Sequence, residues 1–587
     1  MEDLTLRYYD AELRYLREAA KEFAKAHPDR AALLDLDKAG TPDPYVERLF
    51  EGFAFSMGRL RQKIDDDLPE LTEGLVSMLW PHYLRTIPSL SVVAFKPDLQ
   101  SMKMAEILPA GLEVFSRPVG PKNTICRYRT TRDIPLNPLD VSHLAMATEP
   151  DGRSLLRIRF ACSSQADWAQ SDLQCLGLYL SADMPVSHAL HLMLTKRQAA
   201  LYLRLSGQSE RIPLEGYFSP GGFAEEDRLW PKGESAFSGY QLLLEYFAFR
   251  EKFMFVHLHG LESVTLPKGI TSFDVEVVFS SQWPADLPVS HDALRVHCVP
   301  VINLFTLEAD PLTLSGLENE YLLRPQRLQD GHTEIYSVDA VTGSGRNGGV
   351  DYVPFTSFRH RGGMQRATAP ERYYHTRVKR GVTGMHDTWL ILGGPQHEPN
   401  LHAERETVSL RITGTNGQLP RRALQSTLLD RCEQTQQTLM TVRNLCKPTL
   451  PSYPPAEDRF HWRLLGHLGS SFLNMMSNAE VLRGTLSLYN WQDDEMNQRR
   501  LDAILEVKHH RIQRFVQGYL LRGLDIEVTL DSNGFTGEGD IHLFGEMLNR
   551  FLALYADMNQ FNQLTLLIQP EGKCIRWKEN HCPRLPG

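Results

Sequence analysis

The hydrophobic periodicity of the chain changes near residue 89, and this change limits the folds open to it. From about residue 89 to residue 420, apolar side chains alternate with polar ones, and Gly, Pro and Asn interrupt the pattern often. Such alternation is typical of antiparallel strands. The region is roughly three times the length of a single sandwich domain of about 100 residues. We therefore expect more than one sheet. The clearest expected strands are LSVVAF from Leu90, LRIRFAC from Leu156, LYLRLSG from Leu201, SFDVEVVFS from Ser272 and TVSLRITGT from Thr407.

Residues 1–88 carry the helical period instead. Apolar side chains recur there at steps of three and four, which predicts amphipathic helices. In the first helix this seam consists of Leu6, Tyr9, Leu13, Leu16 and Phe23. In a second helix, which begins near Asp43-Pro44, it includes Val46, Leu49, Phe53, Leu60 and Ile64. We expect a helical bundle whose seams pack either within the chain or against a partner helix.

The helical period returns after the proline-rich segment 448–455. We expect helices at about 459–476, 478–489, 494–516 and 541–557, and strands at about 525–530, 563–568 and 573–578. The predicted fold class is α+β with several domains. The regions are an N-terminal helical bundle at 1–88, a β-rich middle at 89–420 and a mixed helical and α+β region at 421–587.

The charge balance argues against two classes of partner. The 587 residues contain 63 Lys and Arg against 72 Asp and Glu, a net charge of −9. A mildly acidic chain without a basic block is poorly suited to nucleic acids or anionic membranes. We expect no transmembrane helix and no signal or transit peptide. The eight cysteines form no C-x-x-C pair, so we expect reduced thiols and a cytoplasmic protein.

The short motifs that could carry chemistry favour structural interpretations. Residues 343–348 match G-x-G-x-x-G, but a loop and a strand are expected to follow rather than a phosphate-binding helix, so we interpret 343–363 as an exposed loop. His257 and His259 share a strand face without a third ligand at readable spacing. The acidic residues at 65–73 fit a helix start better than an ion site. We predict no metal and no cofactor, and no local spacing indicates catalytic residues, although a catalytic triad assembled from residues far apart in the sequence stays open.

The segment YFAFREKFMFVHL, Tyr246 to Leu258, is unusually aromatic. One interpretation is two core strands joined by a turn at Arg250-Glu251-Lys252, because aromatic side chains on strands are usually buried. The other is an aromatic surface for a partner. We favour the core.

Several longer blocks together resemble one family, the TssF (also ImpG or VasA) subunit of the type VI secretion system baseplate. They follow the order of the family across nearly the whole chain. The blocks are YYDAELRYLREAAKEFAKAHP from Tyr8, DPYVERLFEGFAFSMGRLRQKIDDDLPELTEGLVSMLWPHYLRTIPSLSVVAF from Asp43, the aromatic segment from Tyr246, CVPVINLF from Cys298, EIYSVDAVTG from Glu334, NLCKPTLP from Asn444 and GDIHLFGEMLNRFLALYADMNQFNQL from Gly539.

The resemblance implies a non-enzymatic structural subunit of a phage-like contractile machine. In this family two copies join one TssG subunit to form a wedge, and the wedge carries TssK. Wedges surround the VgrG hub, on which the Hcp tube and the contractile sheath assemble. The implied location is the cytoplasm, in a baseplate docked at the inner membrane complex. The implied partners exclude nucleic acid, and no direct membrane insertion is expected.

The resemblance adds an intermolecular role to the two helical seams. We expect the seam residues named above, Leu6 to Phe23 and Val46 to Ile64, to be the protein-interface residues of the wedge. The alternative function is a cytoplasmic enzyme with a β-sandwich region that acts on carbohydrate. That enzyme would need paired carboxylates in a cleft, and no spacing in the sequence indicates them.

Overall fold

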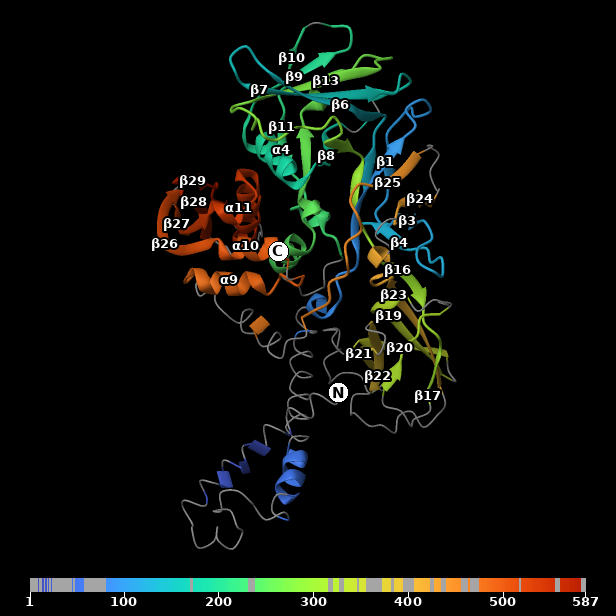
Figure 1. The fold of residues 1–587 in the computed structure, drawn as a ribbon. Helices are drawn as coiled ribbons and strands as arrows, with labels where there is room; N and C mark the ends of the chain where they lie inside the picture. Colours follow the sequence, from blue (N-terminus) through green and yellow to red (C-terminus); the bar gives the residue numbers. More distant parts are fainter. Residues whose placement is uncertain are drawn as a thin grey trace. The chain divides into compact units, whose positions relative to one another are not determined.

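The computed structural model divides the chain into two compact units, residues 1–79 with 456–466, and residues 80–455 with 467–587. Below residue 81 it describes residues 9, 13–14, 16–17, 19–20, 23, 45, 48–57 and 76. From 81 to 581 it describes all residues except 169–170, 172, 209, 231–237, 315–319, 327–331, 346–347, 355–371, 382–384, 394–405, 423–426, 434–439, 456–462, 465–474, 493, 517–518 and 555–559. The fold is α+β with mostly antiparallel sheets, as predicted (Figure 1).

A six-stranded sheet brings together strands of the second unit that are far apart in the sequence. Its order is β24-β3-β4-β15-β1-β25. The bounds are β1 Leu90–Pro97, β3 Glu113–Ser116, β4 Arg127–Thr130, β15 Cys298–Ile302, β24 Leu429–Cys432 and β25 Met440–Asn444. Beyond β25 the proline-rich segment stays bound, because Ile87 and Ser452 exchange two backbone hydrogen bonds of 2.8 and 2.9 Å. A short pair, β2 (Glu106–Leu108) and β5 (Ile134–Leu136), completes this core.

A five-stranded sheet has the order β10-β9-β13-β7-β6. The bounds are β6 Leu139–Thr148, β7 Ser154–Cys162, β9 Gln198–Leu205, β10 Ile212–Pro213 and β13 Ser272–Phe279. The helix α4 (Met184–Lys196) contacts β9 and β13 (Figure 1). Apolar side chains of the central strands, such as Ile158, Leu203 and Val275, are buried on one face, which leaves charged side chains on the other.

A four-stranded sheet, β11-β12-β8-β14, lies next to the aromatic segment. The bounds are β8 Cys175–Leu180, β11 Tyr217–Pro220, β12 Phe255–His259 and β14 Leu294–Val296, with helix α5 Ser238–Ala248 and 3-10 helices η3 Glu225–Asp227, η4 Arg250–Phe253 and η5 Leu261–Ser263. Phe247, Phe249, Phe253 and Phe255 are all buried, so the core interpretation is confirmed. The expected first strand was wrong, because its residues end the helix α5.

The eight-stranded sheet has the order β16-β23-β19-β20-β21-β22-β18, and β17 pairs with β23. The bounds are β16 Phe305–Glu308, β17 Leu312–Leu314, β18 Glu320–Leu322, β19 Glu334–Gly345, β20 Gly348–Pro354, β21 Tyr373–Arg380, β22 His386–Gly393 and β23 Glu406–Thr415. A short helix, α6 (Leu419–Arg422), follows. The glycine-rich motif lies in the β19–β20 hairpin, so the loop interpretation of 343–363 was wrong for the strand residues 343–345 and 348–354. Residues 355–363 lie outside the described part of the chain.

The C-terminal part combines helices with a five-stranded sheet of order β26-β27-β28-β29, in which β30 also pairs with β28. The bounds are α9 Ala479–Ser487, α10 Glu495–Asp502, β26 Ile504–Val516, β27 Tyr519–Asp531, η7 Ser532–Gly534, α11 Glu538–Ala553, β28 Gln560–Gln569, β29 Lys573–Arg576 and β30 Asn580–His581. The expected helix 494–516 was wrong beyond Asp502, where the chain turns at Ala503 and continues as β26. A 3-10 helix, η1 (Pro81–Leu84), begins the described part of this unit.

Candidate functional site

The described part of the N-terminal seams lies on helices. In the first helix Tyr9, Leu13 and Leu16 are half-buried, whereas Phe23 is partly exposed. In the second, residues 45 and 48–57 are helical, and Leu49 and Phe53 are 71% and 54% exposed. The remaining seam residues, Leu6, Val46, Leu60 and Ile64, lie outside the described residues. The role of these side chains in an interface stays a prediction.

Leu49 and Phe53 are four residues apart, so they lie on one face of their helix. Burying a large apolar side chain that is otherwise exposed contributes about 1.5–3 kcal/mol. The only fully buried residue among 48–57 is the small Ala54. The apolar stripe of this helix is therefore a surface that a partner helix could cover.

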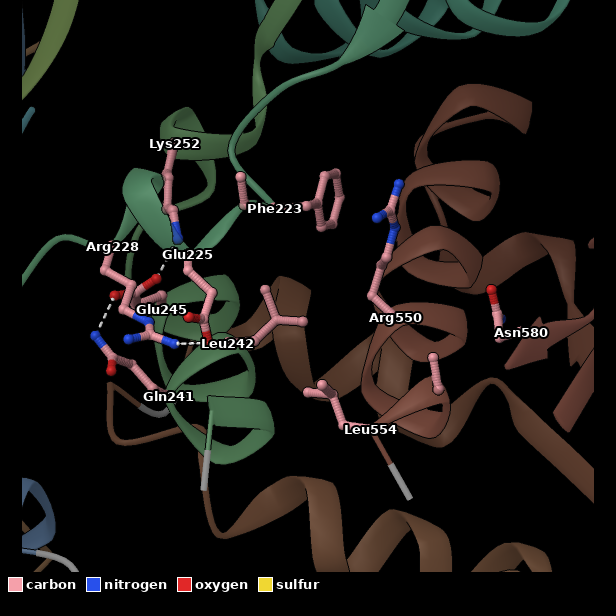
Figure 2. A pocket seen from close by; sticks show the side chains of 12 residues that line it. Phe223, Glu225, Arg228, Gln241, Leu242, Glu245, Lys252, Arg550, Leu554 and Asn580 are labelled. Carbon is pink, nitrogen blue, oxygen red and sulfur yellow. Dashed lines mark hydrogen bonds and ion pairs between the residues drawn. The ribbon is translucent and has the colours of Figure 1, made fainter. Parts of the chain in front are cut away.

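A cavity of about 340 Å³ in the second unit lies between α5 and the end of α11 (Figure 2). Leu242 and Leu554 project into it from opposite sides, and the Arg550 guanidinium lies 5.9 Å from the ring centre of Phe223. Glu245 and Lys252 form a buried ion pair at one wall. Burial lowers the pKa of Lys252, and the attraction of Glu245 opposes this shift. The cavity offers apolar contact, and the lining residues that the structure describes include no Ser, Cys or His that could act as a nucleophile or base.

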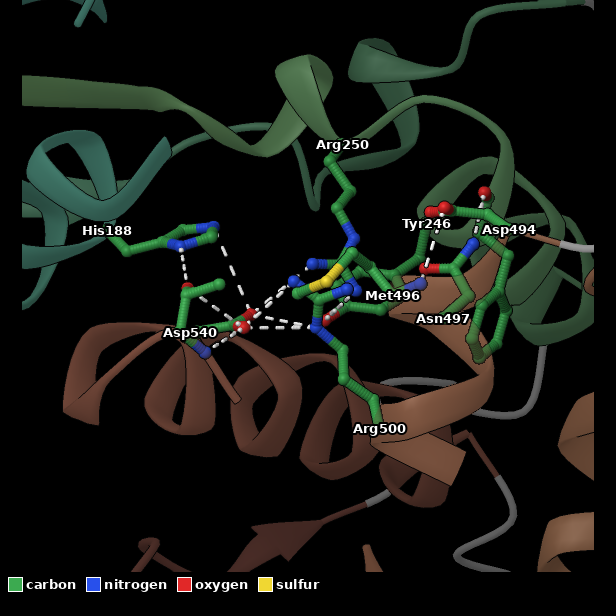
Figure 3. Close-up of polar contacts among 10 residues, drawn as sticks. His188, Tyr246, Arg250, Asp494, Met496, Asn497, Arg500 and Asp540 are labelled. Atoms are coloured by element: carbon green, nitrogen blue, oxygen red, sulfur yellow. Dashed lines mark hydrogen bonds and ion pairs between the residues drawn. The ribbon is translucent and has the colours of Figure 1, made fainter. Parts of the chain in front are cut away.

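A buried carboxylate fastens α11 to three other elements. Asp540 accepts hydrogen bonds from Arg500 Nε at 3.0 Å and from Arg250 Nη1 at 3.3 Å, and it caps the backbone N–H of Thr536 at 3.1 Å. Figure 3 shows Asp540 between His188 of α4 and the two arginines. Burial would raise the pKa of Asp540, but Arg250, His188 and Arg500 together lower it below its usual value. This network connects α11 to α10, η4 and α4, so we interpret its role as stabilisation of the fold.

Three histidines lie buried where α4 meets α11. Burial lowers the pKa of His188 to about 4, of His191 to about 3 and of His542 to about 4, so all three are neutral near pH 7. Neutral imidazoles are good metal ligands. However, no group of three or more His, Cys, Asp or Glu side chains in the described ranges is arranged to hold a metal ion.

Of the histidine pair on β12, His257 and His259, the second has a ring partner and a hydrogen-bond partner. The His259 ring stacks on Tyr217 at 4.7 Å and its Nε2 lies 2.8 Å from Ser219 Oγ. Burial lowers the pKa of His257 to about 4. The acidic residues at 65–73 lie outside the described part of the chain. Among the helices that the structure describes, each is too short or too polar to cross a membrane.

Comparisons with known proteins agree over nearly the full length. The family model "Type VI secretion system, TssF" matches residues 1–584. The type VI secretion system component TssF1 of Pseudomonas aeruginosa is 30% identical over 609 residues, and the alignment covers 98% of each chain. A chain in a cryo-electron microscopy structure of the TssK-TssF-TssG baseplate subcomplex is 79% identical, with a TM-score of 0.83; the match covers 92% of the present chain and all of the other. A chain in a structure of the type VI baseplate complex is 76% identical, with a TM-score of 0.69, covering 99% and 100%.

Proposed function

Because this chain belongs to the TssF family of the type VI secretion system, we propose that two copies of it join one TssG-like subunit in a baseplate wedge. The chain is a structural subunit of the type VI secretion baseplate. The observation that carries the proposal is the 79% identity to a chain solved within a TssK-TssF-TssG subcomplex. At this identity most interface side chains are expected to be shared.

The remaining partners follow from the same family role. Each wedge binds a TssK-like subunit, and several wedges together surround a VgrG-type hub, on which the Hcp tube and the sheath assemble. The assembly works in the cytoplasm, docked at the inner membrane complex. The net charge of −9 supports proteins as the partners of this chain, because it disfavours binding to nucleic acid and to anionic lipid.

The helical seams of the first unit are the contact surface that we assign to the wedge. Leu49 and Phe53 support this assignment, because they are large, apolar and exposed on one helix face. Tyr9, Leu13 and Leu16 form the corresponding stripe on the first helix, with Arg14 and Arg17 exposed beside it. A mixed apolar and charged surface of this kind suits a bundle that is completed by another chain.

The subunit performs no catalysis in this proposal. Two buried titratable groups with shifted pKa values support this view, because their partners hold them in the fold. Asp540 is held by two arginines, and Lys252 is held by Glu245. The two carboxylates that line the cavity beside α5 in the described part of the chain, Glu225 and Glu245, are already in ion pairs with Arg228 and Lys252, so neither is placed like the free acid and base of a glycosidase.

Native mass spectrometry of the chain co-expressed with its TssG-like partner tests the proposal. The expected species contains two copies of this chain and one of the partner, beside a lighter species when the chain is expressed alone. A soluble monomer that does not bind the partner would overturn the proposal. The control is the same chain mixed after purification with a partner that has been heat-denatured.

A further inference from the structure

The outer face of the five-stranded sheet carries an ordered group of arginines. Arg157 and Arg159 lie on β7, Arg204 lies on β9, and Arg211 directly precedes β10. The opposite face is the apolar core that α4 contacts (Figure 1). We call these four side chains the arginine face. It belongs to the second unit and is distant in sequence from the helical seams.

Two carboxylates of the central strand β13 lie beneath this face. Asp274 accepts two hydrogen bonds from Arg159, at 2.7 and 3.0 Å. Glu276 accepts one from Arg157 Nε at 2.9 Å, and Arg211 Nε lies 2.6 Å from its other oxygen. The Glu276 side chain is fully buried, whereas that of Arg159 is 50% exposed. A third carboxylate, Glu149, pairs with Arg211 at 2.8 Å, so the four arginines exceed the carboxylates by one charge and the face is positive.

The buried carboxylates also fix the directions of the guanidinium groups. A guanidinium has five N–H donors, and each carboxylate here uses only one or two of them. Arg211 is also held by Glu149, whereas the side chains of Arg157, Arg159 and Arg204 are 33%, 50% and 38% exposed, so donors of these three face solvent. Because ion pairs already order the arginines, a ligand loses less conformational entropy when it binds to them than it would on free side chains.

We propose that the arginine face docks an extended acidic segment of a partner protein, with carboxylates at alternate positions. Arg157 and Arg159 are two residues apart on one strand, so they repeat at about 6.6 Å. Alternate residues of an extended peptide repeat at the same distance. A short acidic segment meets mainly the local positive charge within about one Debye length, roughly 8–10 Å. A duplex or an anionic bilayer would extend beyond the face and meet the net charge of −9.

This inference does not depend on the wedge proposal, and it is tested on the full chain alone. The probes are two fluorescein-labelled peptides of equal composition, about 12 residues long, one alternating Glu and Gly and one with all Glu in a single block. Fluorescence anisotropy at about 50 mM salt measures binding, and the salt dependence follows. The alternating peptide is expected to bind more tightly, and added salt is expected to weaken its binding.

Two kinds of variant separate this face from general attraction. Arg159→Gln combined with Arg204→Gln is expected to weaken binding about tenfold, since each removes one charged contact. His143→Asp places a carboxylate on β6 opposite Arg159 without removing an ion pair, and it is expected to compete with the peptide. The matched control is Arg117→Gln, which removes a comparable exposed pair with Asp430 elsewhere in the same unit. Its effect is expected to stay below about twofold.

Circular dichroism melting shows whether each variant folds. If the double variant Arg159→Gln with Arg204→Gln does not fold, His143→Asp alone tests the proposal, because it removes no ion pair. The proposal is overturned if both peptides bind alike, if neither binds, or if the variants bind as well as the wild type. Binding of an oligothymidylate, or of phosphatidylserine vesicles, that needs Arg159 and Arg204 while the peptide does not bind would overturn it in favour of those ligands.

Discussion

Two helices of this chain carry apolar side chains, but only one of them buries these side chains within the chain. Along α11 most side chains are buried inside the second unit, including Phe544, Leu548 and Phe551. On the helical residues 48–57 of the first unit, Leu49 and Phe53 are exposed. The sequence pattern of both helices is apolar, so the pattern alone does not say whether the chain covers its own stripe. We infer that α11 stabilises the fold and that the other helix serves assembly.

The largest effect that we expect is a loss of folding stability at acidic pH, which comes from the buried histidines between α4 and α11. The pKa values of His188, His191 and His542 lie at about 4, 3 and 4 in the folded chain, below the usual 6.5. The unfolded chain therefore binds protons first as pH falls, and stability is lost from about pH 6.5 downward. The expected loss in the free energy of unfolding is on the order of 3–6 kcal/mol in all by pH 5.

Urea unfolding at a series of pH values measures this loss. His191→Leu should reduce the dependence, because it removes one of the three buried neutral imidazoles. A free energy of unfolding that stays constant from pH 7 to pH 5 would contradict buried neutral histidines between α4 and α11.

Removing the buried carboxylate of α11 is expected to cost nearly as much. Asp540→Asn leaves Arg250 and Arg500 without their counter-charge, and an uncompensated buried charge costs about 3–5 kcal/mol. Thermal and urea unfolding check this value. The control is Glu571→Gln, whose pair with Lys573 at 3.0 Å is exposed, and it should cost less than about 1 kcal/mol. Equal costs for the two variants would refute the role given to Asp540.

A pair of phenylalanine truncations compares the helices directly. Phe551→Ala removes a fully buried ring from α11 and is expected to destabilise the chain by about 3–5 kcal/mol. Phe53→Ala removes an exposed ring and should change the stability of the isolated chain by no more than about 0.5 kcal/mol. Denaturant midpoints at equal slope measure both. A large cost for Phe53→Ala would mean that this ring is buried within the chain.

The smallest effect concerns the segment that leads from the second unit toward residues 456–466. The Tyr453 hydroxyl donates a 2.7 Å hydrogen bond to Glu334, a buried carboxylate whose pKa burial raises. Tyr453→Phe should cost about 1 kcal/mol. Hydrogen exchange of 448–455 should rise in this variant. Unchanged exchange would show that the backbone pairing with Ile87 alone holds the segment.

Much of the fold follows from the sequence, and the failures have physical causes. The five clearest expected strands are confirmed as parts of β1, β7, β9, β13 and β23. The residues that end α5 were assigned to a strand, because a short aromatic run is compatible with either element. The chain from 494 to 516 was assigned to one helix, because no Gly or Pro marks the turn at Ala503.

The site was less predictable than the fold. The arginine face and the Asp540 network join residues that are far apart in the sequence, such as Arg157 with Glu276 and Arg250 with Asp540. Only strand pairing and helix packing bring these residues together, and no spacing along the sequence indicates that they meet. The alternation of Arg157 and Arg159 on β7, which lie opposite Glu276 and Asp274 respectively on β13, is the one signal that a pairing hypothesis could have used.

The central proposal is that the exposed helix stripe of the first unit binds the partner helices of the wedge. The direct measurement is native mass spectrometry of co-expressed complexes that contain Leu49→Asp with Phe53→Asp. The matched control is Ile107→Asp, which changes a comparably exposed apolar residue in the second unit. We predict that the double variant keeps the melting temperature of the isolated chain but loses the complex, while the control keeps both. A complex that survives in the double variant would contradict the claim.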